Sequence, residues 1–283
     1  EAACGRSVPT IVSEKPLVLT EHQYERVASA RAAAGNRVIS VNNWMHSDLN
    51  RHVRVLLDEE VIGKVRSIFL RTGRNAAALG HDSWSPRWRT DPAHSGGGII
   101  LDHGWHQLYL LLGWMNEPVQ EVSAQTRTSN PRNYPVEDEA GIVLKFASGC
   151  SSIELTWTSS GRSNDGYITG DRGQIAIHDD RVVVHNGEVE RSLPFKGRLT
   201  ESSYHPDWFR EVFRYNVLDE NRREADRNFA EAGVLVSTIA AAYRSAQAHG
   251  EPRRPKQFES SLSTAEEGLV RGNVMRGGWD SPS

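Results

Sequence analysis

The sequence predicts an α/β segment with a parallel sheet, followed by an α+β domain with a mostly antiparallel, open-faced sheet and helices on one side. Two observations predict this order. A β-prone run, a helical run and a second β-prone run follow one another within about the first 41 residues, which is the parallel crossover unit. Residues 119 to about 195 then alternate apolar and polar side chains, before helical periodicity returns at 208–221 and 229–247.

The parallel unit places polar residues where its two strands end. Residues 8–12 are expected to form a buried strand, and residues 37–41 the second strand, with a capped helix between them. Ligands of parallel sheets usually bind at the carboxyl ends of the strands. Lys15 and the pair Asn42-Asn43 follow these two ends and are therefore candidate site residues.

A long polar stretch and a buried helix form the second candidate region. Residues 49–62 are expected to be helical, and the stretch at 72–95 has the length of an active-site loop. Three glycines end it and are followed by the helical residues 99–115, which are apolar on nearly every side. Asp102 and His106 are four residues apart, so on one α-helix they share a face.

This pair suits alcohol oxidation, because an imidazole beside a carboxylate can act as a base near neutral pH. A cation such as Lys15 can stabilise the alkoxide that forms. The alternative is a core histidine with satisfied hydrogen bonds, since the spacing also occurs by chance. A metal site built from Asp102, His103 and His106 with His94 is disfavoured, because adjacent helical residues point in different directions. No metal is predicted.

Composition excludes several other classes of protein. The net charge of -3 and the lack of a basic stripe argue against a nucleic-acid partner. No apolar run approaches the roughly 20 residues that cross a bilayer, so no membrane partner is expected. Two cysteines, far apart, favour a reducing cytoplasm. The first residue is Glu1 rather than Met, so we expect the chain to be part of a longer protein.

Two motifs carry a resemblance to a known family. Glu14-Lys15-Pro16 after a strand, and the sequence GGGIILDHGWH at residues 96–106, together resemble the Gfo/Idh/MocA family of glucose-fructose oxidoreductase, inositol dehydrogenase and rhizopine-catabolism oxidoreductases. The resemblance covers residues 9 to about 254 and includes the order of elements. It implies that residues 1–45 are the C-terminal remnant of a dinucleotide-binding Rossmann domain. Residues 46–255 would be the substrate-binding and oligomerisation domain, and residues 256–283 a loosely ordered tail.

The resemblance also implies the roles of individual residues. Lys15, Asp102 and His106 match the catalytic residues, with His106 as the acid/base and Lys15 assisting. The cofactor-binding candidates are Glu14, Lys15, Pro16, Asn43, Trp88 and Arg89, and the substrate-binding candidates are Lys15, Arg89, Asp102, His103 and His106. Trp88 and Arg89 could equally be a surface aromatic and a solvated charge. Asn43 is a weaker match, because no Arg follows it before Arg51.

The implied activity is that of an NAD- or NADP-dependent dehydrogenase acting on a secondary alcohol of a sugar, sugar acid or cyclitol, and the implied assembly is a homo-oligomer through the open sheet face. The sequence contains no G-x-G-x-x-G phosphate-binding loop, so we expect weak nucleotide binding by these residues alone. Two alternatives stay open. One is a relative that uses the cofactor transiently for elimination or glycosidic cleavage, and the other is a non-catalytic assembly subunit.

Overall fold

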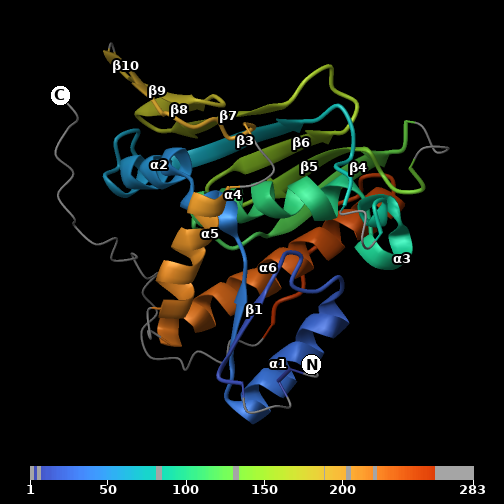
Figure 1. The fold of residues 1–283 in the computed structure, drawn as a ribbon. Coiled ribbons are helices and arrows are strands. Elements are labelled where there is room, and N and C mark those ends of the chain that lie inside the picture. The colour runs from blue at the N-terminus through green and yellow to red at the C-terminus, as the bar shows by residue number, and fades with distance from the viewer. Residues whose placement is uncertain are drawn as a thin grey trace.

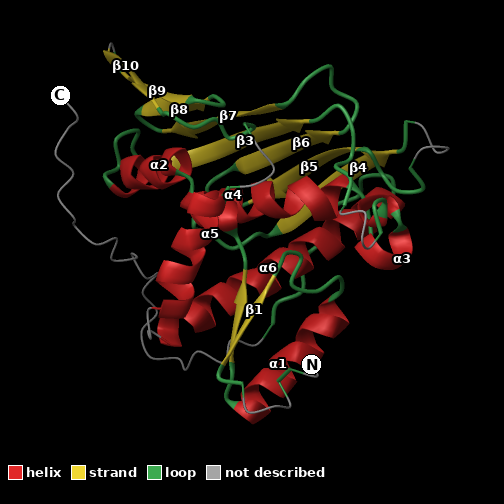
Figure 2. Ribbon diagram, viewed as in Figure 1, coloured by secondary structure: helices red, strands yellow, loops and turns green. Residues whose placement is uncertain are grey.

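The computed structural model describes residues 3–4, 8–80, 85–129, 134–187, 189–201, 205–218 and 222–258. It contains a two-stranded parallel sheet and an eight-stranded, mostly antiparallel sheet within these residues (Figures 1 and 2). The predicted succession of an α/β segment and an α+β domain is therefore confirmed. No helix of the described residues has the length and apolar character needed to cross a membrane.

The parallel unit consists of β1 (Thr10–Ser13), α1 (Glu21–Ala34) and β2 (Arg37–Ser40). Thr20 and Gln23 form a complete capping box at the start of α1, and Gly35 ends the helix at a φ of 68°. The expectation of a buried first strand was wrong, because all four residues of β1 are only half-buried. Within the described residues, β2 is the one strand that pairs with β1.

Four helical segments and one strand follow the parallel unit. The 3-10 helix η1 (Asn43–His46) and the α-helix α2 (Asp48–Asp58) lead to β3 (Val65–Gly73). The short helices η2 (Trp88–Thr90) and α3 (Pro92–Ser95) then interrupt the predicted loop at 72–95. Residues 81–84 of that loop lie outside the described residues. The buried helix predicted at 99–115 is a π-helical turn, η3 (Ile100–Gly104), that continues as α4 (Trp105–Met115).

The large sheet has the strand order β10-β9-β8-β7-β3-β6-β5-β4. Its remaining strands are β4 (Glu121–Arg127), β5 (Glu139–Lys145), β6 (Cys150–Thr156), β7 (Ser163–Gly170), β8 (Gly173–Ile177), β9 (Arg181–Asn186) and β10 (Val189–Pro194). The alternation at 119–195 predicted a mostly antiparallel sheet in this part of the chain, but neither its seven strands one by one nor the insertion of β3 between β6 and β7. The β3–β6 pair is parallel and the β3–β7 pair is antiparallel.

Helices cover one face of this sheet, and Figure 1 shows α2, α4 and α6 on the same side of it. Two further helical segments, α5 (Pro206–Phe213) and the π-helical η4 (Arg214–Leu218), precede the long α6 (Arg222–Gln247). α6 packs against both β2 and β4, so it joins the parallel unit to the large sheet. The core lies between α4, α6 and the covered face of the sheet.

The predicted tail at 256–283 is described only as far as residue 258. Its first residues are in contact with α1: Lys256 pairs with Glu25, and the ring of Phe258 lies 4.6 Å from that of Tyr24. Residues 259–283 lie outside the described residues.

Candidate active site

The three glycines before η3 allow close contacts that no side chain would permit. A Cβ on Gly98 would lie 2.0 Å from the backbone oxygen of Glu137, and one on Gly97 would lie 2.1 Å from the Tyr243 hydroxyl. Gly96 ends α3 at a φ of 73°, which favours glycine. The glycines therefore bring the start of η3 directly against Glu137, just before β5, and against α6.

Glu137 holds this helix start in place. Its carboxylate accepts hydrogen bonds from the Gly98 amide at 2.9 Å, the Ile100 amide at 3.2 Å and the Tyr243 hydroxyl at 2.7 Å. Amides in the first turn of a helix lack intrahelical partners, and a carboxylate there is also favoured by the helix dipole. Burial nevertheless raises the pKa of Glu137, although the hydrogen bonds from Tyr243 and the amides oppose this shift. Sequence reasoning did not find either Glu137 or Tyr243.

The π-helical turn changes which side chains meet. Sequence reasoning placed Asp102 and His106 one turn apart on an α-helix, but a π-helix has a wider turn. The histidine in contact with Asp102 is His103, with Nδ1 3.2 Å from Oδ2. His103 thus contacts Asp102 although the two residues are adjacent in the sequence. π-Helical turns often occur at functional sites.

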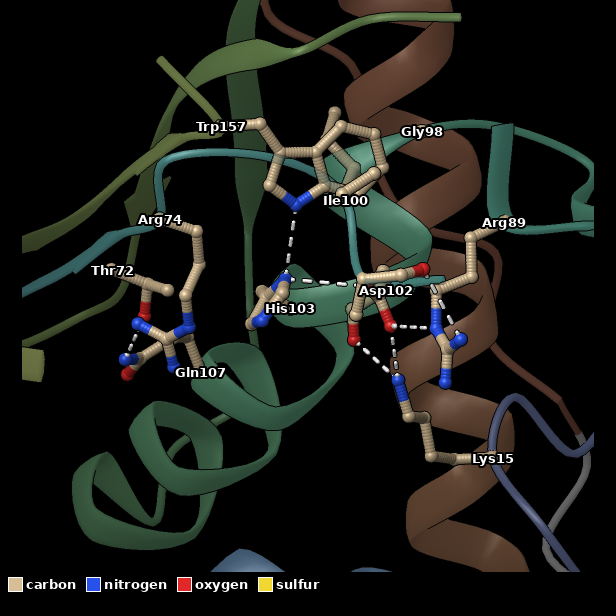
Figure 3. Close-up of polar contacts among 12 residues, drawn as sticks. Lys15, Thr72, Arg74, Arg89, Gly98, Ile100, Asp102, His103, Gln107 and Trp157 are labelled. Carbon is tan, nitrogen blue, oxygen red and sulfur yellow. Dashed lines mark hydrogen bonds and ion pairs between the residues drawn. The ribbon is translucent and has the colours of Figure 1, made fainter. Parts of the chain in front are cut away.

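Lys15 and Asp102 form an ion pair across 87 positions of the sequence (Figure 3). The Lys15 Nζ lies 2.8 Å from Asp102 Oδ1 and 2.7 Å from its backbone oxygen. Arg89 approaches the same Oδ1 with its Nε at 3.7 Å. Burial opposes the ionisation of Asp102, but Lys15, His103 and Arg89 outweigh it and hold the pKa of Asp102 well below its usual range. Asp102 is therefore a carboxylate at neutral pH.

His103 lies between Asp102 and Trp157. The Trp157 indole Nε1–H donates to His103 Nδ1 at 3.3 Å. The same Nδ1 atom also faces the Asp102 carboxylate. A proton on Nδ1 would be donated to Asp102, whereas a proton on Nε2 leaves Nδ1 free to accept from Trp157. Burial, together with Arg74 and Lys15, lowers the pKa of His103 to about 3 against the opposite effect of Asp102. The ring is therefore neutral in either tautomer.

His106 lies flat against Trp44, with ring centroids 4.6 Å apart and planes 3° from parallel. Burial is the main cause that lowers the pKa of His106 well below its ordinary value, followed by the charge of Lys15. His106 is thus a neutral imidazole, able to accept a proton. Sequence reasoning did not nominate Trp44, although it directly follows Asn43.

The other predicted cofactor residues lie at the edge of this group. Glu14 accepts a hydrogen bond from the Lys15 amide at 3.2 Å, and the Lys15–Pro16 peptide bond is cis. Trp88 packs under the Arg89 guanidinium, 4.5 Å from its ring centroid. Asn43 is buried at the start of η1 and has no part in the described hydrogen bonds of Lys15 and Asp102.

A second polar group, which sequence reasoning missed, adjoins the first. Gln107 donates to the Thr72 hydroxyl at 2.6 Å, and that hydroxyl and Arg74 both donate to Asn164 Oδ1, at 3.0 Å and 3.2 Å. Figure 3 shows Arg74 and Gln107 on the side of His103 away from Lys15 and Arg89. The only local signal was Gln107, a polar residue on a buried helix directly after His106.

No group of three or more histidine, cysteine or acidic side chains among the described residues has the arrangement of a metal site. The site brings together two neutral imidazoles, one carboxylate and the surrounding cations.

Comparison with known proteins places these residues in a family. Residues 50–176 match the family model of the GFO/IDH/MocA C-terminal domain. This part of the chain is therefore similar to a GFO/IDH/MocA C-terminal domain. The matched residues of this GFO/IDH/MocA domain include Asp102, His103 and His106, whereas Lys15 and Tyr243 lie outside them and reach the site through tertiary contacts.

A curated relative supports the family. Oxidoreductase P35 of Formosa agariphila is 28% identical over 184 residues, which are 62% of this chain and 55% of the relative. The match therefore spans about half the length of that relative.

Solved structures share the fold. An inositol dehydrogenase homolog from Azotobacter vinelandii, in complex with NAD+, is 18% identical with a TM-score of 0.72, covering 89% of this chain and 74% of that one. Levoglucosan dehydrogenase, in complex with NADH and levoglucosan, is 17% identical with a TM-score of 0.72, covering 91% and 76%. At these identities the likeness shows that the GFO/IDH/MocA fold is shared.

Proposed function

We propose that this protein is an NAD-dependent oxidoreductase that acts on a secondary alcohol of a sugar, sugar acid or cyclitol. The observation that carries this proposal is the group formed by Lys15, Asp102, His103 and His106 within a GFO/IDH/MocA domain. Support also comes from proteins of the same fold, among them an inositol dehydrogenase homolog solved with NADH and myo-inositol and a levoglucosan dehydrogenase solved with NADH. These structures contain NAD or NADH, which favours NAD over NADP.

The described residues fit the reactive end of the cofactor rather than its phosphates. Lys15 and Pro16 follow the carboxyl end of β1, which is where parallel strands present ligands. Lys15 and Asp102 keep 15% and 11% of their side-chain surface exposed, so the group can be reached from solvent. NAD would supply the hydride acceptor beside Lys15, and the sequence holds no glycine loop for its pyrophosphate.

The residues themselves can manage the proton. His106 accepts the hydroxyl proton of the substrate, which a neutral imidazole can do. The Lys15 ammonium stabilises the alkoxide that forms, and the Asp102 carboxylate fixes the ammonium by accepting its hydrogen bond at 2.8 Å. His103 lies next to the same carboxylate and is the alternative base.

The test is NAD reduction by the protein carrying this sequence, with a panel of sugars, sugar acids and cyclitols. His106→Asn is expected to lower kcat by about 100-fold or more, as loss of a general base does, and His103→Asn by less. Lys15→Met is expected to lower kcat by a similar factor through the lost alkoxide contact. Cofactor binding should persist in the two histidine variants.

Lys145→Met is the matched control for Lys15→Met. Lys145 lies at the end of β5 and forms an exposed ion pair with Glu121 of β4. Unchanged kcat in both His106→Asn and His103→Asn would rule out the proposed base. A substrate consumed without net NADH formation would identify transient use of the cofactor instead. No reaction across the whole panel would favour the non-catalytic alternative.

We also propose that copies of the chain associate through the uncovered face of the large sheet. The strand register aligns Val143, Ser152, Phe69 and Tyr167 in one row across that face. Val143 and Tyr167 are exposed large side chains in this row. Such a row is the kind of surface that protein contacts cover.

A further inference from the structure

The charges around the site do not balance. The carboxylate of Asp102 lies near three cations, since Lys15 and Arg89 contact it directly and Arg74 lies on the other side of His103 (Figure 3). Arg162 and the Asp179 carboxylate also act on Arg74, so four cations face two carboxylates and an excess of two positive charges is left. Neither imidazole adds to it, because burial keeps His103 and His106 neutral by lowering their pKa values.

Arg74 is the cation that the proposed reaction does not use. It follows β3 directly, and only 4% of the residue is exposed. Its NH1 donates to the backbone oxygens of Gly73 and Ser163, at 2.7 Å and 2.8 Å, and its NH2 donates to Asn164 at 3.2 Å. Its Nε is buried without a hydrogen-bond partner.

No acidic side chain of the described residues lies within ion-pair distance of Arg74. The contrast with Arg71, three residues earlier, is direct, since Arg71 holds Asp165 with two hydrogen bonds at 3.0 Å and 2.9 Å. A buried cation without an anion costs several kcal/mol, and proteins seldom retain one unless another charge offsets it. Burial is the main cause that lowers the pKa of Arg74 to about 10, and the exposed Arg162 acts in the same direction against the opposite effect of Asp102 and Asp179.

We propose that the substrate is an anion, a sugar acid whose carboxylate offsets the excess positive charge of Lys15, Arg74 and Arg89. This inference rests on the proposed function and selects one of its substrate classes. Arg89 is the direct partner of the substrate's carboxylate. Its side chain is 26% exposed, whereas that of Lys15 is 15% exposed. The contacts of Arg89 with Asp102 and with the backbone oxygens of Ala78 and Leu79 are long, at 3.7, 3.4 and 3.3 Å. Arg74 acts through space, because it is buried behind His103.

A different role for the cations gives a different result. If they only stabilise the alkoxide, they favour every alcohol alike, with or without a carboxylate. If they recognise an anion, they favour the acid over its neutral counterpart, and added salt weakens the preference. Matched pairs of acid and neutral sugars therefore separate the two roles.

The experiment compares D-glucuronate with D-glucose, D-galacturonate with D-galactose, and D-mannuronate with D-mannose, on the protein carrying this sequence with NAD present. Both kcat/KM and equilibrium binding by calorimetry are measured. At least one acid is expected to exceed its neutral partner by about 100-fold, the range of a charged pair in a partly buried site. Arg89→Gln and Arg74→Gln should each reduce that preference by about 10-fold, mainly through KM, and Arg74→Lys should retain most of it.

Arg71→Gln is the matched control, because Arg71 is an exposed arginine of β3, three residues before Arg74, and is already paired with Asp165. Arg74→Gln also removes buried hydrogen bonds, so its thermal unfolding is measured alongside. Arg162→Gln is a second variant at an exposed position, where the preference should fall about 2-fold or 3-fold without loss of stability.

Equal kcat/KM and equal affinity for acid and neutral sugars, or no binding of any acid, would overturn the inference. An acid preference that stays the same in Arg89→Gln, Arg74→Gln and Arg162→Gln would overturn the inference as well. Preferential binding of an acid without NAD reduction would support the anion site while contradicting the proposed oxidoreductase activity.

Discussion

At the scale of single residues, the site combines charged and neutral groups whose states follow from burial. Asp102 stays ionised because Lys15, His103 and Arg89 outweigh the cost of burying it. The histidines stay neutral because burial outweighs the attraction of Asp102. A base and an ionised carboxylate therefore coexist at neutral pH within a few residues of one another, which is a common arrangement in active sites.

The neutral histidines predict how stability depends on pH. Burial lowers the pKa of His46 to about 4 and that of His103 to about 3, and it lowers that of His106 well below its ordinary value. As the pH falls from 7 to 5, the unfolded chain binds protons at these three rings that the folded chain does not bind. The free energy of unfolding should therefore fall with pH, by up to about 1.4 kcal/mol per pH unit for each ring.

Denaturant titrations across this pH range measure the slope. Glu137 acts in the opposite sense, because a raised carboxyl pKa favours the folded state as the pH falls, but it is one group against three. His46→Phe should make the slope shallower by about one third, since it removes one of three similar contributions. A free energy of unfolding that is flat between pH 7 and pH 5 would contradict the buried, neutral state of these rings.

At the scale of elements, the candidate site depends on the exact path of η3. Glycines allow this segment to touch Glu137 and Tyr243, and the Glu137 carboxylate binds its first amides. The chain then makes a π-helical turn that places His103 against Asp102. The position of the site is therefore set by contacts from Glu137, which precedes β5, and from α6, as well as by the helix that carries it.

Gly98→Ala tests this dependence. The added Cβ would meet the Glu137 backbone oxygen at 2.0 Å, and a backbone atom cannot move aside as a flexible side chain can. We expect the variant to lose about 3 kcal/mol of unfolding free energy, the upper range for overpacking, measured by denaturant unfolding. Activity should fall with it, because η3 carries Asp102 and His103.

Gly141→Ala is the control. Gly141 lies on β5, and a Cβ added there would have no neighbouring atom within 4 Å, so this variant should be neutral or slightly stabilising. Equal stability of the two alanine variants would show that η3 does not need its close contact with Glu137.

At the scale of the whole molecule, α6 holds the two sheets together. Tyr243 near its C-terminal end binds Glu137, and the Ser245 hydroxyl accepts from the Ala124 amide at 2.9 Å. Near its other end, Asn228 binds Ser40 of β2 twice: its Oδ1 accepts from the amide at 2.7 Å and its Nδ2 donates to the backbone oxygen at 3.1 Å. The Asn228 side chain thus pairs with β2 as a neighbouring strand would.

Asn228→Ala should therefore loosen the parallel unit. It leaves the buried amide and carbonyl of Ser40 unpaired, at a cost of about 1–3 kcal/mol for each group, and we expect a total loss of about 3 kcal/mol. Denaturant unfolding measures this loss, and hydrogen exchange should show a faster-exchanging Ser40 amide. Gln247→Ala, at an exposed position on the same helix, is the control. Unchanged exchange at Ser40 would show that α6 does not support β2 through Asn228.

The sequence by itself determined the features that depend on near neighbours. The capping box of α1 lies within four residues, the alternation that predicts β4 to β10 is local to each strand, and the motifs around Lys15 and Asp102 resemble those of a family. The order of elements and the assignment of Lys15 and Asp102 to one site followed from these signals. The proposed roles of Lys15, Asp102 and His106 stay predictions.

Only the tertiary structure decided the features that join distant segments. The π-helical turn depends on Glu137 and Tyr243, which are 106 positions apart, and the buried Arg74 meets Asn164 across 90 positions. The insertion of β3 beside β6 likewise gave no local signal. Hydrogen bonds and charges act over a few ångströms in space, so a pattern that is read along the chain cannot show which distant side chains supply them.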